Sequence, residues 1–257
     1  MKTLSYLFNS QPGEILWFPS LTSTNDTAKE LAESGRAEGT CVIADQQTSG
    51  RGRQGRSWYS PAGEALYLSL VLKPSTAAEK LQLITLATAI AAAETAKQFL
   101  LNQAPNIKWP NDILINNRKV CGILVESSFE GGKVKYVILG IGFNLNQTQF
   151  PPGINDLATS LRIENGSEYD RQEFALALLD RIAHWYSIVQ NDQTDAVINR
   201  WSELSNYAND KSVTIDLGHE QLSGITCGLS ETGALRLKTK NGTVTTINAG
   251  EIVNLRS

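Results

Sequence analysis

The longest helix-like segment of the chain lies among segments that are typical of β-strands. Residues 77–101 carry Ala, Leu and Ile at helical spacing, and residues 174–189 and 196–204 repeat this pattern later in the chain. A shorter helix is predicted through Ala28, Leu31 and Ala32 and would end at Gly35. Strand-like apolar runs lie on both sides of the helix at 77–101: residues 14–18, 40–44, 65–72, two short strands within 107–115, 120–127 and 134–139. Strands mixed with helices in this order predict an α/β domain with one main core.

The pattern changes after about residue 208. Short strand-like runs alternate with glycine turns, and Asn241-Gly242 is a strong hairpin signal. We therefore expect a small β-barrel or meander attached to the larger domain. The predicted boundaries are residues 1–207 for the α/β domain and 208–257 for the β domain.

Composition limits the class of function. The chain has 257 residues, of which 41% are hydrophobic and 19% are charged, so it can bury a core. Its net charge of -3 argues against a surface that binds nucleic acid or anionic membrane as a whole. There is no apolar run of ~18 residues, and the apolar run after Met1 is too short and too polar for a signal peptide.

Cysteine and histidine usage bears on location and metal binding. Cys41, Cys121 and Cys227 lie far apart, cannot all pair, and lack metal-ligand spacing. This usage indicates a reducing compartment, and we expect a cytoplasmic protein. His184 and His219 are the only histidines, so a multi-histidine metal centre is excluded and no protein-bound metal is predicted.

Residues 47–58 form the most informative loop. Three arginines and three glycines share it: Arg51, Arg53, Arg56, Gly50, Gly52 and Gly55. Glycines let the backbone approach a ligand, and guanidinium groups bind carboxylate or phosphate oxygens through paired hydrogen bonds. The loop therefore predicts a site for a ligand with several anionic oxygens. The alternative, a solvated flexible loop, is disfavoured because these arginines cluster within an acidic chain.

Two known phosphate-binding motifs do not explain this loop. The glycines match G-x-G-x-x-G, but the residues after Gly55 do not open a helix and no suitable acidic residue follows a second strand. The loop also approaches the P-loop pattern, but Arg56 replaces its lysine and again no helix follows. An anion-binding loop without a helix N-terminus remains.

Residues 107–113 contain a second candidate site. Pro110 restricts Trp109 to an extended conformation, which fixes the direction of the neighbouring Lys108. An ammonium held in this way suits charge stabilisation at a phosphate or carboxylate. Asp112 could orient a neighbour or hold a metal through water. Taken alone, the segment also fits an ordinary turn with a lysine that extends to solvent.

The polar residues at 22–25 and the glycine-rich strand end at 140–146 are weak signals individually. The first is typical of a helix cap, with Ser23 and Asp26 at capping spacing, and the second of close packing. Together with the two stronger segments, the order of motifs resembles the biotin–protein ligases, also called biotin–[acetyl-CoA-carboxylase] ligases. The matching segments are residues 23–25, Gln47, 50–58, 108–112, 118–126 and 140–146.

The resemblance implies both a fold and a reaction. The fold is an α/β (α+β) catalytic domain with a mixed sheet, followed by a small C-terminal SH3-like β-barrel. The reaction joins biotin to ATP as biotinyl-5′-AMP and transfers biotin to a lysine of the biotin carboxyl carrier protein of acetyl-CoA carboxylase. Because Met1 lies close to the catalytic segment, we expect the single-function type without a DNA-binding helix-turn-helix, and neither DNA nor membrane as a partner. Exposed edge strands next to the site are expected either to pair subunits as a homodimer or to dock the acceptor by strand addition.

The resemblance also assigns residues. Lys108, Arg51 and Arg53 are implied as catalytic groups. The implied biotin-binding residues are Ser23, Thr24, Asn25, Gln47, Arg51, Gly52, Arg53, Lys108 and Gly122. The implied ATP-binding residues are Arg53, Arg56, Trp58, Lys108, Asn111 and Asn144. Mg²⁺ is expected to screen the triphosphate.

Three alternatives remain open on the sequence. A lipoate or octanoate transferase would share the catalytic fold, although the arginine-glycine loop and the K-W-P-N-D string favour biotin. A nucleic-acid binding module could use Arg51, Arg53 and Arg56, but the chain is acidic and few aromatics accompany them. A repressor without enzymatic activity is disfavoured because no helix-turn-helix is expected.

Overall fold

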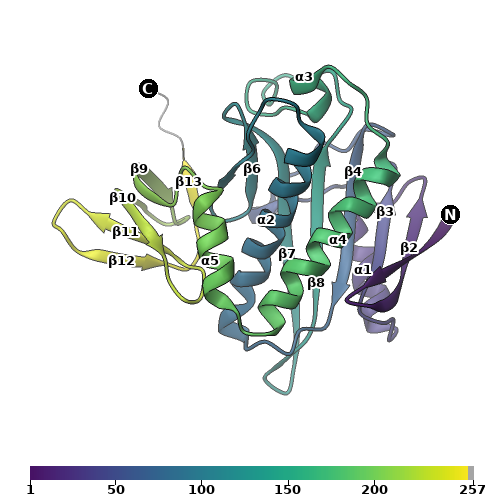
Figure 1. The fold of residues 1–257 in the computed structure, drawn as a ribbon, viewed down its shortest axis with the longest axis horizontal. Helices are drawn as coiled ribbons and strands as arrows, with labels where there is room; N and C mark the ends of the chain where they lie inside the picture. Colours follow the sequence, from purple (N-terminus) through teal and green to yellow (C-terminus); the bar gives the residue numbers. More distant parts are fainter. Residues whose placement is uncertain (254–257) are drawn as a thin grey trace.

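A computed structural model describes residues 1–253 of the chain. A large mixed sheet with helices on it occupies most of the molecule, and a small antiparallel sheet lies beside it (Figure 1). The large sheet has the strand order β1-β2-β3-β4-β8-β7-β6-β5. Its strands are β1 Lys2–Phe8, β2 Gln11–Phe18, β3 Thr40–Ala44, β4 Ala65–Leu72, β5 Asn106–Lys108, β6 Asp112–Ile115, β7 Arg118–Glu130 and β8 Lys133–Asn144.

The large sheet is mixed, as expected, because one strand pair is parallel. The helix α1 (Thr24–Glu33) connects β2 to β3, and these two strands pair in parallel. The remaining neighbours are antiparallel. The other helices are α2 Leu81–Phe99, α3 Leu161–Asn165, α4 Arg171–Gln190 and α5 Thr194–Glu203.

The two faces of the sheet have different coverings. The helices α2, α4 and α5 lie over one face (Figure 1), and odd-numbered residues of β8 such as Leu139 and Phe143 join their core. Even-numbered residues point to the other face, since side chains alternate along a strand. There Tyr136 and Ile138 pack with α1, and Gly140 and Gly142 follow farther along β8. Large apolar side chains thus give way to glycines along this face.

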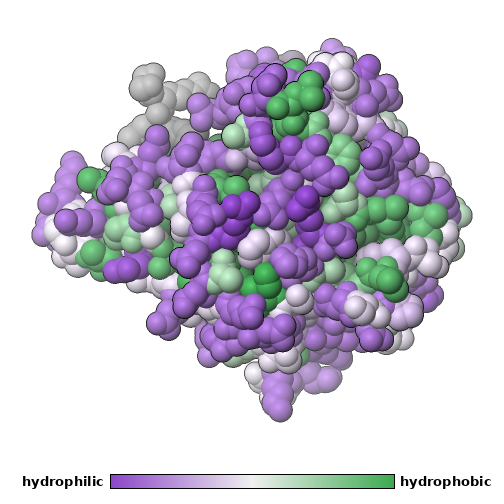
Figure 2. Space-filling view, in the orientation of Figure 1, coloured by the Kyte–Doolittle hydropathy of each residue, from purple (hydrophilic) through white to green (hydrophobic). Residues whose placement is uncertain are grey.

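The outer surface over the helices is mainly hydrophilic. Figure 2 shows polar residues across α2, α4 and α5 with hydrophobic residues in separate small groups. Scattered exposed apolar residues of this kind are normal for a protein surface. No helix within residues 1–253 combines the length and the apolar character that crossing a membrane requires.

The C-terminal sheet is antiparallel, with the order β12-β11-β10-β9-β13. Its strands are β9 Asn209–Asp216, β10 Gln221–Leu229, β11 Leu235–Thr239, β12 Val244–Ile247 and β13 Glu251–Val253. The predicted meander is confirmed for β9 to β12, which are neighbours in chain order. Its ladder does not close into a ring within residues 1–253, because β12 and β13 are its two edges. Residues 254–257 of the predicted tail domain lie outside the described residues.

Most sequence-predicted elements are confirmed, and three were missed. The predicted strands at 40–44 and 65–72 coincide with β3 and β4, and the predicted helix at 77–101 is α2 preceded by a short 3₁₀ turn at Ala78–Lys80. The sequence did not predict β1, α3 or β13. These three are an edge strand, a helix of 5 residues and a strand of 3 residues.

Candidate active site

A cavity of about 590 Å³ lies on the sheet face that carries α1. Strands β7 and β8, the start of α1, the loop after β3, the turn between β5 and β6, and strand β13 all contribute to its lining. The cavity brings together every residue that the sequence analysis assigned to biotin or ATP: Ser23, Thr24, Asn25, Gln47, Arg51, Gly52, Arg53, Arg56, Trp58, Lys108, Asn111, Gly122 and Asn144.

One end of the cavity is lined by neutral polar groups. Ser23 occupies the N-cap position of α1, but its side chain makes no cap hydrogen bond, contrary to the capping interpretation of this segment. Instead, the backbone N–H of Thr24 donates to Gln47 Oε1 at 2.9 Å. Gln47 Nε2 donates to Ser60 Oγ at 3.2 Å. The amide of Gln47 therefore joins the helix start to the far end of the arginine-glycine loop.

The Ser23 hydroxyl differs from its neighbours. Ser23 is only 3% exposed, yet within residues 1–253 its hydroxyl has no hydrogen-bond partner. Thr24 and Asn25 are similarly buried, but both side chains have partners inside the protein. The hydroxyl is open to the cavity that Ser23 lines. Ser23 therefore offers an unused donor and acceptor to a ligand at this end.

Two of the three loop arginines are paired with carboxylates. The Arg51 guanidinium donates two hydrogen bonds to Asp26, at 2.7 and 2.6 Å, and this bonding lowers the pKa of the Asp26 carboxyl. Arg56 pairs with Glu251 of β13 through both terminal nitrogens. These contacts anchor the loop to α1 on one side and to the C-terminal sheet on the other.

Arg53 and Lys108 are the cations that remain without a carboxylate. Within residues 1–253 neither forms an ion pair, and Arg53 donates only to neutral oxygens, Asn111 Oδ1 at 3.1 Å and Gly250 O at 3.3 Å. Burial lowers the pKa of both groups, while Asp112 and Glu251 at longer range oppose this shift. Two partly desolvated cations without counter-ions make a strong site for an anionic ligand.

Two glycines form a flat floor beneath Trp58. Gly122 and Gly142 are directly opposite each other on β7 and β8. A Cβ atom at Gly142 would lie 2.4 Å from the Trp58 indole, and one at Gly122 would lie 2.8 Å from it. The Trp58 Nε1–H is buried there without a partner among the described residues. Glycine is therefore required at both positions for the indole to lie on the sheet.

Lys119 of β7 was not singled out from the sequence. Its ammonium lies 2.6 Å from Asp112 Oδ1 and 5.2 Å from the centre of the Trp58 ring. It lines the cavity beside Gly122. Asp112 therefore orients the ammonium of Lys119, which is one of the two roles expected for this carboxylate. The signal available in the sequence was the adjacent pair Arg118-Lys119, which lies within a matching segment but has no distinctive spacing.

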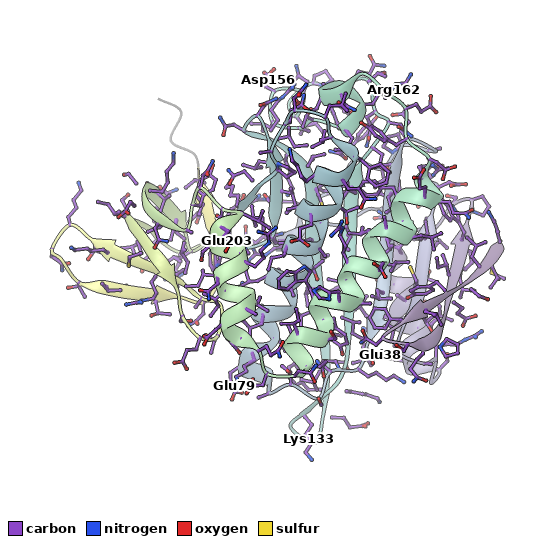
Figure 3. The ribbon with its side chains drawn as sticks, viewed as in Figure 1. Glu38, Glu79, Lys133, Asp156, Arg162 and Glu203 are labelled. Carbon is purple, nitrogen blue, oxygen red and sulfur yellow. The ribbon has the colours of Figure 1, made fainter. Side chains whose placement is uncertain are left out.

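The segment after β8 closes one wall of the cavity. Asn144 Nδ2 donates to Thr159 O at 2.9 Å, and Asn144 Oδ1 accepts from Gln147 Nε2 at 3.1 Å. The expected ATP contact of Asn144 stays a prediction, since both ends of its amide already hold this segment. Asp156 of this segment and Arg162 of α3 lie together at one end of the molecule (Figure 3). Residues of the segment that line the cavity are Phe150, Ile154, Leu157 and Ala158.

The carboxylates of the cavity bear on metal binding. No group of three or more His, Cys, Asp and Glu side chains in residues 1–253 could hold a metal ion. Asp112 and Glu251 line the cavity separately, and each is paired with a cation. Two separate carboxylates fit a magnesium ion that arrives on nucleotide phosphates, because Mg²⁺ keeps several waters and takes few protein ligands.

Comparison with known proteins identifies the family. The profile described as "Biotin/lipoate A/B protein ligase family" matches residues 17–144, and "Biotin protein ligase C terminal domain" matches residues 210–253. A biotin–[acetyl-CoA-carboxylase] ligase of Paracoccus denitrificans is 34% identical over 222 residues, covering 84% of this chain and 90% of the relative. The chain belongs to the biotin/lipoate A/B protein ligase family. The resemblance inferred from the motifs is thereby confirmed.

Solved structures of this family share the fold. The biotin protein ligase of Aquifex aeolicus, in complex with biotin and ATP, superposes with a TM-score of 0.81 at 32% identity, covering 95% of this chain and 99% of the other. The bifunctional ligase/repressor BirA of Bacillus subtilis is 43% identical over 159 residues. The chain spans about half the length of this relative and of the ligase/repressor BirA of Bacillus spizizenii, 49% and 47%.

Proposed function

We propose that the chain activates biotin with ATP and transfers it to a lysine of the biotin carboxyl carrier protein of acetyl-CoA carboxylase. The observation that carries this proposal is the arrangement of one cavity, with neutral polar groups at one end and the unpaired cations Arg53 and Lys108 at the other. Biotin has the matching form, a neutral urea joined by an apolar chain to a carboxylate. The Aquifex structure with biotin and ATP supports the same pair of ligands.

The polar end suits the urea of biotin. A urea carries one acceptor and two donors, so it needs hydroxyl and amide groups together. The unused hydroxyl of Ser23 and the amide of Gln47 supply both kinds of group. The indole of Trp58, which lies on the glycine floor, and Leu124 of β7 offer an apolar surface to the ring and chain.

The cationic end suits the first chemical step. A carboxylate oxygen of biotin attacks the α-phosphorus of ATP, the bond from that phosphorus to the bridging oxygen breaks, and pyrophosphate leaves. The two reactants are anions and repel each other. Arg53 and Lys108 would lower this repulsion and stabilise charge that develops in the transition state. Magnesium, held by the phosphates and approached by Asp112 and Glu251, would screen the triphosphate.

The second step transfers the biotinyl group. A neutral amine of the acceptor lysine attacks the carbonyl of the mixed anhydride, AMP leaves, and the amine loses a proton. The adenylate also reacts with water, so the site must exclude water until the acceptor arrives. The arginine-glycine loop and Trp58 cover the floor of the cavity and are placed for this role.

Biotin-dependent exchange of labelled pyrophosphate into ATP tests the activation step. We expect the purified chain with biotin, ATP and Mg²⁺ to catalyse this exchange and then to label a biotin carboxyl carrier protein. Replacing biotin by lipoate in the same assay tests the nearest alternative, a lipoate or octanoate transferase. Exchange with lipoate but not with biotin would contradict the proposal.

Location and assembly stay proposals. The three cysteines are free thiols, which supports the proposed location in the reducing cytoplasm. The strand β1 ends the large sheet, so its outer edge is unpaired within residues 1–253. Strand pairing at such an edge would form the proposed homodimer, and sedimentation at several protein concentrations tests it.

Replacing Arg53 by glycine is expected to keep the fold but release the adenylate early. Arg53 connects the loop to Asn111 and to Gly250, so the variant loses both attachments. The released adenylate should label lysines of an unrelated protein such as serum albumin. Gln54→Gly serves as the control, because it adds a glycine to the same loop and leaves these attachments in place. Equal albumin labelling by the wild-type chain and Arg53→Gly would remove the loop from this role.

A further inference from the structure

The polar end of the cavity rests on the buried side chains of Thr24, Ser69 and Asn25, and this row ends at Glu126, whose side chain is 47% exposed. Asn25 Nδ2 donates to Glu126 Oε2 of β7 at 2.5 Å. On the other side of the amide, Asn25 Oδ1 lies 2.6 Å from Ser69 Oγ of β4, and Ser69 Oγ lies 2.7 Å from Thr24 Oγ1. Neither Glu126 nor Ser69 lines the cavity, so both act behind the residues that do.

Counting hydrogens assigns the orientation of the Asn25 amide. A carboxylate accepts, so Glu126 fixes the NH₂ of Asn25 toward itself and the carbonyl oxygen toward Ser69. That oxygen has no hydrogen, so the Ser69 hydroxyl is its donor. The same hydroxyl also lies against Thr24 Oγ1, whose own hydroxyl donates to Gln47 Oε1. Asn25 thus lies between a carboxylate at its NH₂ and a hydroxyl donor at its oxygen.

The Thr24 end of this row determines which end of the Gln47 side-chain amide faces the cavity. Gln47 Oε1 lies close to both the backbone N–H and the hydroxyl of Thr24, at 2.9 and 3.1 Å. Both the N–H and the hydroxyl of Thr24 donate to Oε1 and hold it at the helix start. The NH₂ of Gln47 then faces away, toward Ser60 and the cavity. An amide N–H at that place suits a carbonyl acceptor on the ligand.

The sheet prevents Asn25 from leaving this arrangement. Gly140 of β8 is directly opposite Ser69 on β4. A Cβ atom at Gly140 would lie 2.2 Å from Asn25 Oδ1, so the amide occupies the space that any larger residue would need. Its neighbour Ser69 is fully buried. The orientation of Asn25 therefore depends on hydrogen bonding, and only Glu126 distinguishes its two ends.

We propose that Glu126 is a positioning residue that sets the donor and acceptor pattern of the polar end for a cyclic urea. This inference rests on the proposed function, because it assigns that end to the urea of biotin. Replacing the carboxylate of Glu126 by an amide removes the preference for one orientation of Asn25, since a glutamine side chain can donate or accept. Asn25 can then flip, and the hydrogens of Ser69, Thr24 and the amide of Gln47 can rearrange with it. The variant should lose its preference among ligands with different hydrogen-bonding groups, while the shape of the polar end stays the same.

The test measures the dissociation constants of three ligands on the full chain by calorimetry. The ligands are biotin, 2-iminobiotin, which replaces the urea oxygen by a nitrogen donor, and desthiobiotin, which keeps the urea and lacks the sulfur. Glu126→Gln and Ser69→Ala should each reduce the preference for biotin over 2-iminobiotin by about tenfold. The preference for biotin over desthiobiotin should not change. Glu130→Gln, on the same strand and paired only with exposed Lys135, is the matched control.

Ser69→Ala separates this inference from a second effect of Glu126. Glu126 also lies 3.7 Å from Arg51, so Glu126→Gln weakens that contact, whereas Ser69→Ala leaves it intact. If only Glu126→Gln lowers the preference, the carboxylate acts through Arg51 and the inference is overturned. It is also overturned if both variants keep the wild-type preference. Failure of the unmodified chain to bind biotin would instead contradict the proposed function itself, together with what rests on it.

Discussion

Replacing Lys108 by alanine is expected to slow biotin-dependent ATP–pyrophosphate exchange by about 100- to 1000-fold, the usual effect of removing one group that stabilises transition-state charge. Lys108 ends β5 next to the turn at Pro110, so its position is fixed by the sheet. Its ammonium is partly desolvated and has no ion-pair partner within residues 1–253. The Lys108 ammonium is therefore available to pair with a carboxylate or phosphate of the ligand.

Two controls make the result specific to position 108. Lys97→Ala removes an exposed lysine of α2 that donates only to a backbone oxygen, and it should leave the exchange unchanged. Lys108→Arg keeps the charge but presents a wider, planar group, so it should recover part of the rate. Exchange at the wild-type rate by Lys108→Ala would remove Lys108 from the proposed chemistry and shift that role to Arg53.

The sequence predicted the central elements of the fold because their patterns are long and regular. The strand β4 has 8 buried residues and the helix α2 has 19 residues with apolar side chains at helical spacing, so both are distinct in the sequence. The strand β1 is different. It lies at the edge of the sheet, most of its residues are partly or fully exposed, and its polar residues weaken any apolar pattern. The strand β13 is too short for any period to show.

The composition of the site could be predicted, but its pairing could not. Local motifs placed Arg51, Arg53 and Arg56 in one anion-binding loop, and all three line the cavity. Which of them is free depends on residues far away in sequence. Arg56 pairs with Glu251, 195 residues later, and no local spacing indicates that contact. The distinction between paired and unpaired cations thus exists only in the folded chain.

The supporting residues behind the site were missed for a related reason. Ser69 lies in the middle of an apolar strand, where a single serine carries no signal of function. Glu126 is the last residue of the matching segment 118–126. Its role depends on contact with Asn25, which lies 101 residues away in sequence, so no local pattern indicates it. Sequence motifs therefore predicted residues that line the cavity, whereas the residues packed behind them required the structure.

Replacing Gly142 by alanine is expected to weaken ATP binding in the presence of biotin by about 5- to 150-fold. The added Cβ would lie 2.4 Å from the Trp58 indole, closer than atoms can approach, and would also meet Nε1 at 2.5 Å. The indole must then leave the floor, and overpacking of this kind costs about 1–3 kcal/mol, which converts to the stated change in affinity. Because Trp58 belongs to the loop that covers the cavity, hydrolysis of the adenylate should rise as well.

The double variant Gly142→Ala with Trp58→Ala identifies the cause of this loss. Removing the indole removes the collision, so the double variant should recover the thermal stability that Gly142→Ala loses, while its ATP affinity stays low because the aromatic face is gone. Leu139→Val is the control on the same strand, since Leu139 joins the core under the helices and does not line the cavity. Calorimetric titration with ATP and thermal melting of all four chains provide the measurement. Wild-type ATP affinity in Gly142→Ala would show that Trp58 does not need the glycine floor to complete the nucleotide site.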